Sequence, residues 1–282
     1  MIVCRTKEEV YALINESTRL KQVLGLVPTM GSLHEGHLSL ISEALRHNDI
    51  VWVTIFVNPT QFDNKKDLSN YPKNLENDIQ LIKKISDNIN VFHPSETEIY
   101  DGKPFLKKYD FNHLDLELEG KFRADHFNGV ATIVSKLFEL FKPSNAYFGE
   151  KDFQQTQIIN RLIDIEKIDL NMIICPTIRE ENGLALSSRN KLLSVKNKDK
   201  SSIIYKNLIF LQKSFIKNRN KLNLEKIKSE INFVNDFKIE YLEIVNNKSL
   251  QIELKFRENE SYRAFICVNV NGVRLIDNIL LN

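Results

Sequence analysis

The sequence lacks the features that mark several classes of protein. It has only three cysteines, Cys4, Cys175 and Cys267, which lie far apart and form no CxxC pair. This pattern argues against a disulfide scaffold and against a zinc site. No apolar run approaches the roughly 20 residues of a membrane-spanning helix, and the first ten residues contain no apolar signal-peptide region. We therefore expect a cytoplasmic protein without a membrane partner.

An excess of charge of one sign is also missing. Lys and Arg total 39 against 37 for Asp and Glu, a net charge of +2, which argues against a nucleic-acid partner. There is no Walker A motif and no GxGxxG, so neither a P-loop kinase nor a dinucleotide enzyme is expected. With 42% hydrophobic and 27% charged residues among 282, the chain can bury a core.

The first 175 residues alternate between apolar runs and helical patterns. Residues 24–29 and 50–57 are almost wholly apolar, as buried parallel strands are. Leu38, Ile41 and Leu45 recur at helical spacing between them. Other expected strands are 91–93, 146–148 and 172–175, and other expected helices are 75–85, 127–141 and 153–167. This alternation predicts an α/β fold, a doubly wound, Rossmann-like parallel sheet over residues 1–175.

The pattern changes after residue 175. Residues 196–234 are helical and rich in lysine, and residues 237–245, 250–255 and 262–270 alternate as antiparallel strands do. Asn271-Gly272 is a strong two-residue hairpin signal. We therefore expect a smaller C-terminal α+β domain over residues 176–282.

Four polar clusters each follow a predicted strand, at residues 29–37, 58–62, 149–152 and 178–190. In open parallel sheets, ligands bind beyond the carboxyl ends of the strands. The four clusters together therefore indicate one ligand site.

The first cluster contains His34-Glu35-Gly36-His37 at the start of a predicted helix. Helix N-termini attract anions, and imidazole N–H groups there could hold phosphate oxygens. The alternatives are a metal pair or a surface cap, although the HExxH spacing of a zinc protease is absent.

The other clusters carry weaker signals. Gly149 and Lys151 suit close approach of a phosphate, or form an ordinary solvated turn. The hydroxyls and arginine of residues 186–190 could wrap a triphosphate or, equally, cap a helix. The side-chain amides of Asn58, Gln61 and Gln154-Gln155 could orient the hydroxyl and carboxylate groups of a ligand. Alternatively, Asn58-Pro59 could be a simple turn.

Together, the segments PTMGSLHEGHLSLI, VTIFVNPTQF, YFGEKDFQQ and LALSSRN resemble the pantothenate synthetase (pantoate–β-alanine ligase) family across the whole chain. That family belongs to the HxGH nucleotidylyltransferase superfamily. The resemblance implies a Rossmann-like domain that binds ATP and pantoate, a C-terminal lid domain and a homodimer.

The resemblance also implies residue roles. Catalysis would fall to His34, His37, Lys151 and Arg189, with His37 as a proton donor. The implied ATP contacts are Met30, Gly31, Ser32, Leu33, His34, Glu35, Gly36, His37, Gly149, Glu150, Lys151, Asp152, Ile178, Leu186, Ser187, Ser188 and Arg189. The implied substrate contacts are Gln61, Gln155, Asn58 and Arg123, and Asp78 would help to hold Mg²⁺.

Three positions depart from the family pattern. Leu186 stands where Met is usual, and Asp125 brings a carboxylate into the Arg123–Phe127 segment, where it would weaken the binding of an anionic substrate. Residues 76–78 leave Asp78 as the single aspartate of its acidic stretch.

The resemblance implies a ligase that works in two steps. Pantoate would attack the α-phosphate of MgATP to give pantoyl adenylate and pyrophosphate, and β-alanine would then displace AMP. Two alternatives are a superfamily enzyme with a phosphorylated acceptor, which would need more basic residues, and a non-catalytic nucleotide-binding protein, which would have a degenerate site.

Overall fold

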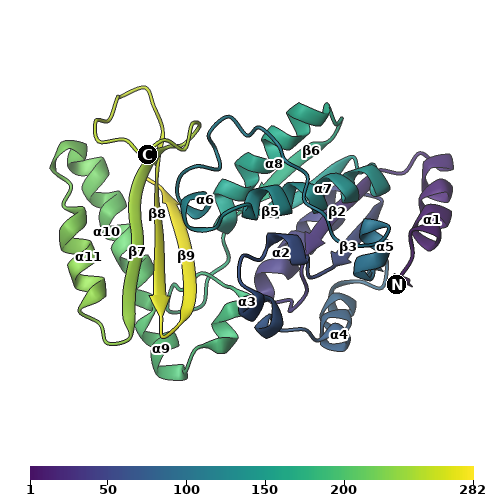
Figure 1. The fold of residues 1–282 in the computed structure, drawn as a ribbon, viewed down its shortest axis with the longest axis horizontal. Helices are drawn as coiled ribbons and strands as arrows, with labels where there is room; N and C mark the ends of the chain where they lie inside the picture. The colour runs from purple at the N-terminus through teal and green to yellow at the C-terminus, as the bar shows by residue number, and fades with distance from the viewer. The chain divides into compact units, whose positions relative to one another are not determined.

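Six parallel strands form the larger of two sheets. The structure, a computed structural model, describes residues 1–282 except for the side chains of Lys65 and Lys66. The strands lie in the order β1-β4-β3-β2-β5-β6, and Figure 1 labels β3, β2, β5 and β6 among them. Their bounds are β1 (Val3–Cys4), β2 (Leu24–Thr29), β3 (Ile50–Ile55), β4 (Ile89–Phe92), β5 (Asn145–Gly149) and β6 (Asn171–Cys175). The winding reverses between β2 and β5, and ligands bind such sheets at this point.

Helices cover both faces of this sheet. Ile41 of α2 (Glu35–His47) and Ile82 of α4 (Leu75–Ile85) pack in one cluster with Val53 of β3. On the opposite face, the ring of Phe141, from α7 (His126–Phe141), lies 5.2 Å from that of Trp52. The other helices of this part are α1 (Lys7–Arg19), α3 (Lys65–Asn70), α5 (Glu96–Tyr100) and α8 (Phe153–Glu166). The predicted doubly wound sheet is confirmed.

The second sheet is antiparallel, with the order β7-β8-β9. Its strands are β7 (Phe237–Asn246), β8 (Tyr262–Val270) and β9 (Val273–Leu280). Asn271 and Gly272 join β8 to β9 with φ values of 49° and 86°, as a type I′ turn requires, so the predicted hairpin is confirmed. The accompanying helices are α9 (Val195–Lys200), α10 (Ser202–Asn218) and α11 (Leu224–Asn232).

The two faces of the antiparallel sheet carry different coverings. Buried residues of α10 and α11 form a core with one set of alternating strand residues, among them Ile266 and Leu275. The other set, including Phe265 and Cys267, packs with Leu118 and Phe153. Segments that precede residue 176 therefore supply part of the apolar cluster on this second face of the sheet.

The chain consequently divides into two compact units that interleave in sequence. Unit 1 comprises residues 1–111, 123–150 and 155–176, and unit 2 comprises residues 112–122, 151–154 and 177–282. Unit 2 thus takes in two segments that the sequence analysis placed in the N-terminal domain. The Gln154 amide joins these segments, because it donates to Leu114 O and Glu117 O at 2.9 and 2.8 Å. No local pattern of residues reveals such a long-range tie.

Two details of the C-terminal half differ from expectation. The predicted strand at 250–255 is wrong: the chain turns where Leu250 N donates to Asn246 O, and only an isolated bridge joins Ile252 to Val245. Leu254 is 88% exposed, so the apolar alternation there has no surface to cover. The helical region 196–234 is divided among α9, α10 and α11.

Within the described residues, no helix combines the length and apolar character of a membrane span.

Candidate active site

The loop after β2 begins the candidate site at the switch point of the sheet. Gly31 and Ser32 adopt left-handed backbone conformations, with φ values of 77° and 51°. A Cβ on Gly31 would lie 3.0 Å from an oxygen of Asp78, so a larger residue does not fit without movement. Asp78, on α4 and only 1% exposed, accepts hydrogen bonds from Ser32 N and Leu33 N, both at 2.8 Å. This buried carboxylate holds the loop in shape.

His34 and His37 lie together at the start of α2. His34 is the N-cap, and its Nδ1 accepts from Gly36 N at 3.1 Å, so the neutral ring carries its proton on Nε2. The centroids of the two imidazole rings are 4.1 Å apart. The pair therefore occupies the positive end of a 13-residue helix, where anions are stabilised.

The loop after β3 brings Gln61 beside the first loop. Gln61 Nε2 lies 3.1 Å from the sulfur of Met30. Asn58, 1% exposed, donates to Gln61 Oε1 and to Gly129 O, both at 3.1 Å. Asn58 Oδ1 accepts from the Tyr100 hydroxyl at 2.5 Å. Burial raises the pKa of the Tyr100 phenol, so Tyr100 remains a hydrogen-bond donor to Asn58. Held in this way, Asn58 orients the side chain of Gln61.

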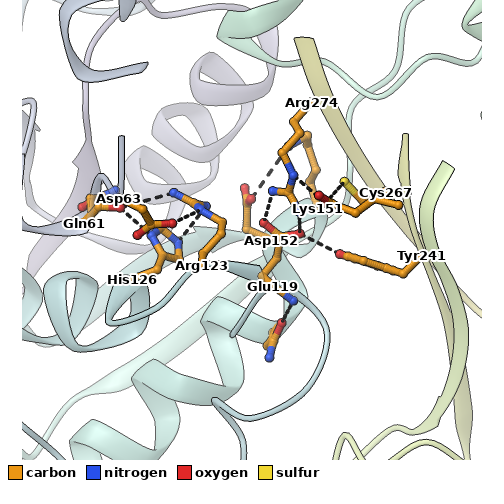
Figure 2. A network of polar contacts seen from close by, with 12 residues as sticks. Gln61, Asp63, Glu119, Arg123, His126, Lys151, Asp152, Tyr241, Cys267 and Arg274 are labelled. Atoms are coloured by element: carbon orange, nitrogen blue, oxygen red, sulfur yellow. Dashed lines mark hydrogen bonds and ion pairs between the residues drawn. The ribbon is translucent and has the colours of Figure 1, made fainter. Parts of the chain in front are cut away.

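A second cluster contacts the backbone of Gln61 (Figure 2). His126 Nδ1 lies 2.7 Å from Gln61 O, and Arg123 Nη2 donates to the same oxygen at 3.3 Å. Arg123 Nη1 also lies 3.1 Å from His126 Nε2, and Arg123 Nε lies 3.6 Å from Asp63 Oδ2. Arg123 thus supports the Gln61 loop.

The carboxylate of Asp125 is turned to other partners. It pairs with Lys108, accepts from Asn128 Nδ2 at 3.4 Å and is exposed. The expected effect of Asp125 on substrate affinity stays a prediction, and these contacts do not favour it.

Three further candidates of unit 1 lie between the end of β5 and the first turn of α8. Gly149 ends β5, and a Cβ built on it would meet no atom within 4 Å. The backbone there is open to close approach by a ligand. Gln155 is half-buried in the first turn of α8. Glu150 begins the 3₁₀ turn Glu150–Asp152 that joins these two elements.

The remaining candidates belong to unit 2. Lys151 Nζ lies 3.8 Å from Asp152 Oδ1, and the Lys151 carbonyl accepts from Asn278 Nδ2 at 2.9 Å. Residues 178–186 form a small hairpin closed by Leu186 N donating to Ile178 O at 3.0 Å.

Ser187 then caps the 3₁₀ turn Ser188–Leu192, because its Oγ accepts from Arg189 N at 3.2 Å. Ser187 therefore has the capping role offered for this stretch, and its expected contact with a nucleotide stays a prediction. Ser188 is buried, and Arg189 is half-buried.

A network that the sequence did not reveal fastens the short helix α6 (Glu119–Phe122) within unit 2 (Figure 2). The Glu119 carboxylate accepts from Arg274 at 2.7 and 2.9 Å and from the Tyr241 hydroxyl at 2.8 Å. Burial raises the pKa of Tyr241, which keeps its phenol a donor.

Comparison with known proteins gives the family. A model of the family described as pantoate-beta-alanine ligase matches residues 2–280. A pantothenate synthetase from Christiangramia forsetii is 44% identical over 282 residues and covers 100% of both chains.

The chain belongs to the pantoate–β-alanine ligase family.

Solved structures agree with this assignment. A pantothenate synthetase from Thermus thermophilus has a TM-score of 0.89 at 34% identity and covers 100% of this ligase and 99% of that chain. A Francisella tularensis pantoate–β-alanine ligase, complexed with Beta-gamma ATP and β-alanine, has a TM-score of 0.83 at 37% identity, with coverages of 100% and 98%.

The metal role expected for Asp78 does not fit its surroundings in this ligase. Both carboxylate oxygens accept backbone N–H groups, and the side chain is buried. Among the described residues, no group of three His, Cys, Asp or Glu side chains is arranged to hold a metal ion. The expected role of Asp78 as a Mg²⁺ ligand therefore stays a prediction that these contacts do not favour.

The sequence analysis gave no role to His126, Tyr100 or Asp63, although each contacts a residue of the Asn58–Gln61 loop or its Arg123 support. His126 stood within the quoted Arg123–Phe127 segment, so its signal was present. Asp63 lies in a polar loop and Tyr100 ends the short helix α5, and no local pattern marks either residue.

Proposed function

We propose that this ligase condenses pantoate with β-alanine at the expense of ATP, through a pantoyl adenylate. The observation that carries the proposal is the His34–His37 pair at the start of α2, beyond the carboxyl end of β2 and beside the switch point. Support also comes from the Francisella tularensis relative, which is complexed with Beta-gamma ATP and β-alanine.

In the first step, a carboxylate oxygen of pantoate attacks the α-phosphorus of ATP, and the bond to the bridging oxygen breaks to release pyrophosphate. Negative charge accumulates on the leaving phosphates. Imidazole N–H donors aimed at that charge stabilise the transition state more than the ground state. We assign this role to His34 and His37, with His37 as the proton donor. Residues Met30–Leu33 and Glu35–Gly36 would contact ATP through the loop and first helical turn.

In the second step, the amine of β-alanine attacks the acyl carbon, AMP leaves, and the amine loses a proton. Gln61 and Gln155 are proposed to hold the hydroxyl and carboxyl groups of pantoate. Asn58 and Arg123 act through Gln61, because both contact it in the structure. The chain itself need form no covalent bond, since positioning and charge neutralisation suffice.

The proposal for the remaining residues rests on the family resemblance. Gly149 and Glu150 would contact the nucleotide in unit 1. In unit 2, the proposed nucleotide contacts are Lys151, Asp152, Ile178, Leu186, Ser187, Ser188 and Arg189. Lys151 and Arg189 would neutralise phosphate charge. We also propose that residues 176–282 act as a lid on residues 1–175.

We further propose that Mg²⁺ arrives bound to the phosphates of ATP, as part of the substrate. The enzyme would be a cytoplasmic homodimer. All three cysteines are free buried thiols, as a reducing compartment permits.

Pyrophosphate release from ATP tests the proposal. Pantoate alone should support release of pyrophosphate, and AMP should follow only after β-alanine is added. A phosphorylated acceptor in place of pantoate would indicate another superfamily reaction, and ATP binding without turnover would indicate a binding protein. Absence of pantoate-dependent pyrophosphate would overturn the proposed function.

A further inference from the structure

Two adjacent residues of β9, Asp277 and Asn278, are buried and polar, each 4% exposed. Successive residues of a strand point to opposite faces of the sheet. Leu275 and Asp277 therefore share the face that packs on α10, whereas Ile276 and Asn278 share the face that packs on Phe153. One strand thus presents a polar group to each side.

Asp277 holds the segment that contains Ile178. Its two oxygens accept from Arg179 at 2.5 and 2.9 Å in a bidentate pair. The Arg179 guanidinium also donates to Gly183 O at 3.2 Å and lies 3.7 Å from the ring centroid of Tyr205 on α10. Arg179 is therefore clamped, and with it the hairpin 178–186 that leads into Ser187.

Asn278 holds the segment that contains Lys151. Its Nδ2 donates to Lys151 O at 2.9 Å, and its Oδ1 accepts from Arg263. The Arg263 guanidinium lies 3.8 Å from the ring centroid of Phe153, two residues beyond Lys151. Asn278 N also donates to Asp277 Oδ1 at 2.8 Å, which joins the two anchors.

We propose that Asp277 and Asn278 are positioning residues that fix Lys151 and the 178–189 segment in register with each other on unit 2. The inference rests on the proposed function, because it takes these two segments to be the phosphate-binding parts of unit 2. Neither residue touches a reacting atom. Their effect is to set the spacing between one lysine and one arginine-bearing loop before the nucleotide arrives.

Asn278→Asp separates this role from a general loss of fold. The new carboxylate keeps the Arg263 partner but replaces the donor to Lys151 O with a second acceptor. Because misplacement of a group by about 1 Å can cost about 100-fold in rate, we expect pantoate-dependent pyrophosphate release to fall about 10- to 100-fold. The reaction of β-alanine with supplied pantoyl adenylate should stay close to wild type, since the adenylate has only one phosphate.

Two further variants keep the test decisive. Asp277→Asn preserves the shape of the side chain and removes the negative charge that pairs with Arg179. It should show the same step-specific loss together with faster amide exchange over 178–186. Asn207→Asp is the matched control: Asn207 is a buried asparagine on α10 that donates to Ile203 O at 3.0 Å. It should lower the melting temperature without changing the ratio of the two half-reactions.

Each outcome decides one claim. A shift in the half-reaction ratio for both β9 variants but not for Asn207→Asp supports the positioning role. Equal loss in both half-reactions, unchanged adenylation or the same shift in the control overturns it. The wild type is measured first, and lack of pantoate-dependent pyrophosphate release there contradicts the proposed function itself, whatever the variants do.

Discussion

Replacing Asp78 with asparagine distinguishes a loop anchor from a metal ligand. The carboxylate accepts from Ser32 N and Leu33 N at 2.8 Å each, in a buried position on α4. Asparagine retains one oxygen, so one of the two bonds is lost and an N–H group faces an NH₂ group. A hydrogen bond to a charged group contributes about 1.5–3 kcal/mol.

The loss should therefore lower the free energy of unfolding by about 1.5–3 kcal/mol, which for a unit of this size lowers the melting temperature by roughly 3–12 °C. The loop that the carboxylate holds leads directly into His34. Displacement of His34 by a fraction of an ångström should slow pyrophosphate release about 10-fold or more.

The assay is pantoate-dependent pyrophosphate release across a magnesium titration, with a thermal melt of each variant. Glu76→Gln is the matched control, because Glu76 is an exposed carboxylate in the same first turn of α4. If Asp78 is an anchor, added Mg²⁺ does not restore the rate and the control behaves as wild type. Recovery of the Asp78→Asn rate at high Mg²⁺, with an unchanged melting temperature, would refute the anchor role and support a metal ligand.

Four other predictions address different parts of the chain. His37→Ala should fold normally, and its rate of adenylation, measured as pyrophosphate release, should fall about 10²–10³-fold. His47→Ala is the control, because His47 is exposed at the far end of α2. Near-wild-type release by His37→Ala would contradict the role of His37. Lys151→Ala should be defective in the first step but rescued by supplied pantoyl adenylate, and an equal defect with the adenylate would assign Lys151 another role. Asp125→Gly should be about 1 kcal/mol more stable than Asp125→Ala in thermal melts, because position 125 has a φ of 62° and both changes remove the same ion pair; equal stabilities would show that the backbone is not strained there. Burial raises the pKa of the Glu243 carboxyl in the folded state, so ionisation of this group destabilises the fold as the pH rises through that pKa. Glu243→Gln should therefore raise the melting temperature near pH 7 but not near pH 4. The reverse pH dependence would contradict the raised pKa.

The sequence alone determined five of the six strands of the larger sheet, and the two-residue strand β1 was not among those expected. Runs such as LGLVPT and IVWVTIFV are short and apolar on both faces, as buried parallel strands are. They became β2 and β3 within two residues of the expected ends. Asn271-Gly272 determined its hairpin because few other dipeptides adopt the two left-handed conformations readily. The motif HEGH, which follows an apolar strand and opens an amphipathic helix, indicated that its histidines lie at a helix N-terminus, as they do at the start of α2.

The tertiary structure decided what depends on partners distant in the chain. The pattern at 250–255 alternates like a strand, yet no surface receives its apolar side chains, so it is not one. The family resemblance implied a metal-binding role for Asp78, and only the folded loop shows the backbone N–H groups from which its oxygens accept hydrogen bonds. Asp277 and Asn278 carry no signal beyond two polar residues in an apolar strand. Their partners, Arg179 and the Lys151 carbonyl, lie 98 and 127 residues away, and only folding brings a buried polar group to the partner that offsets its desolvation.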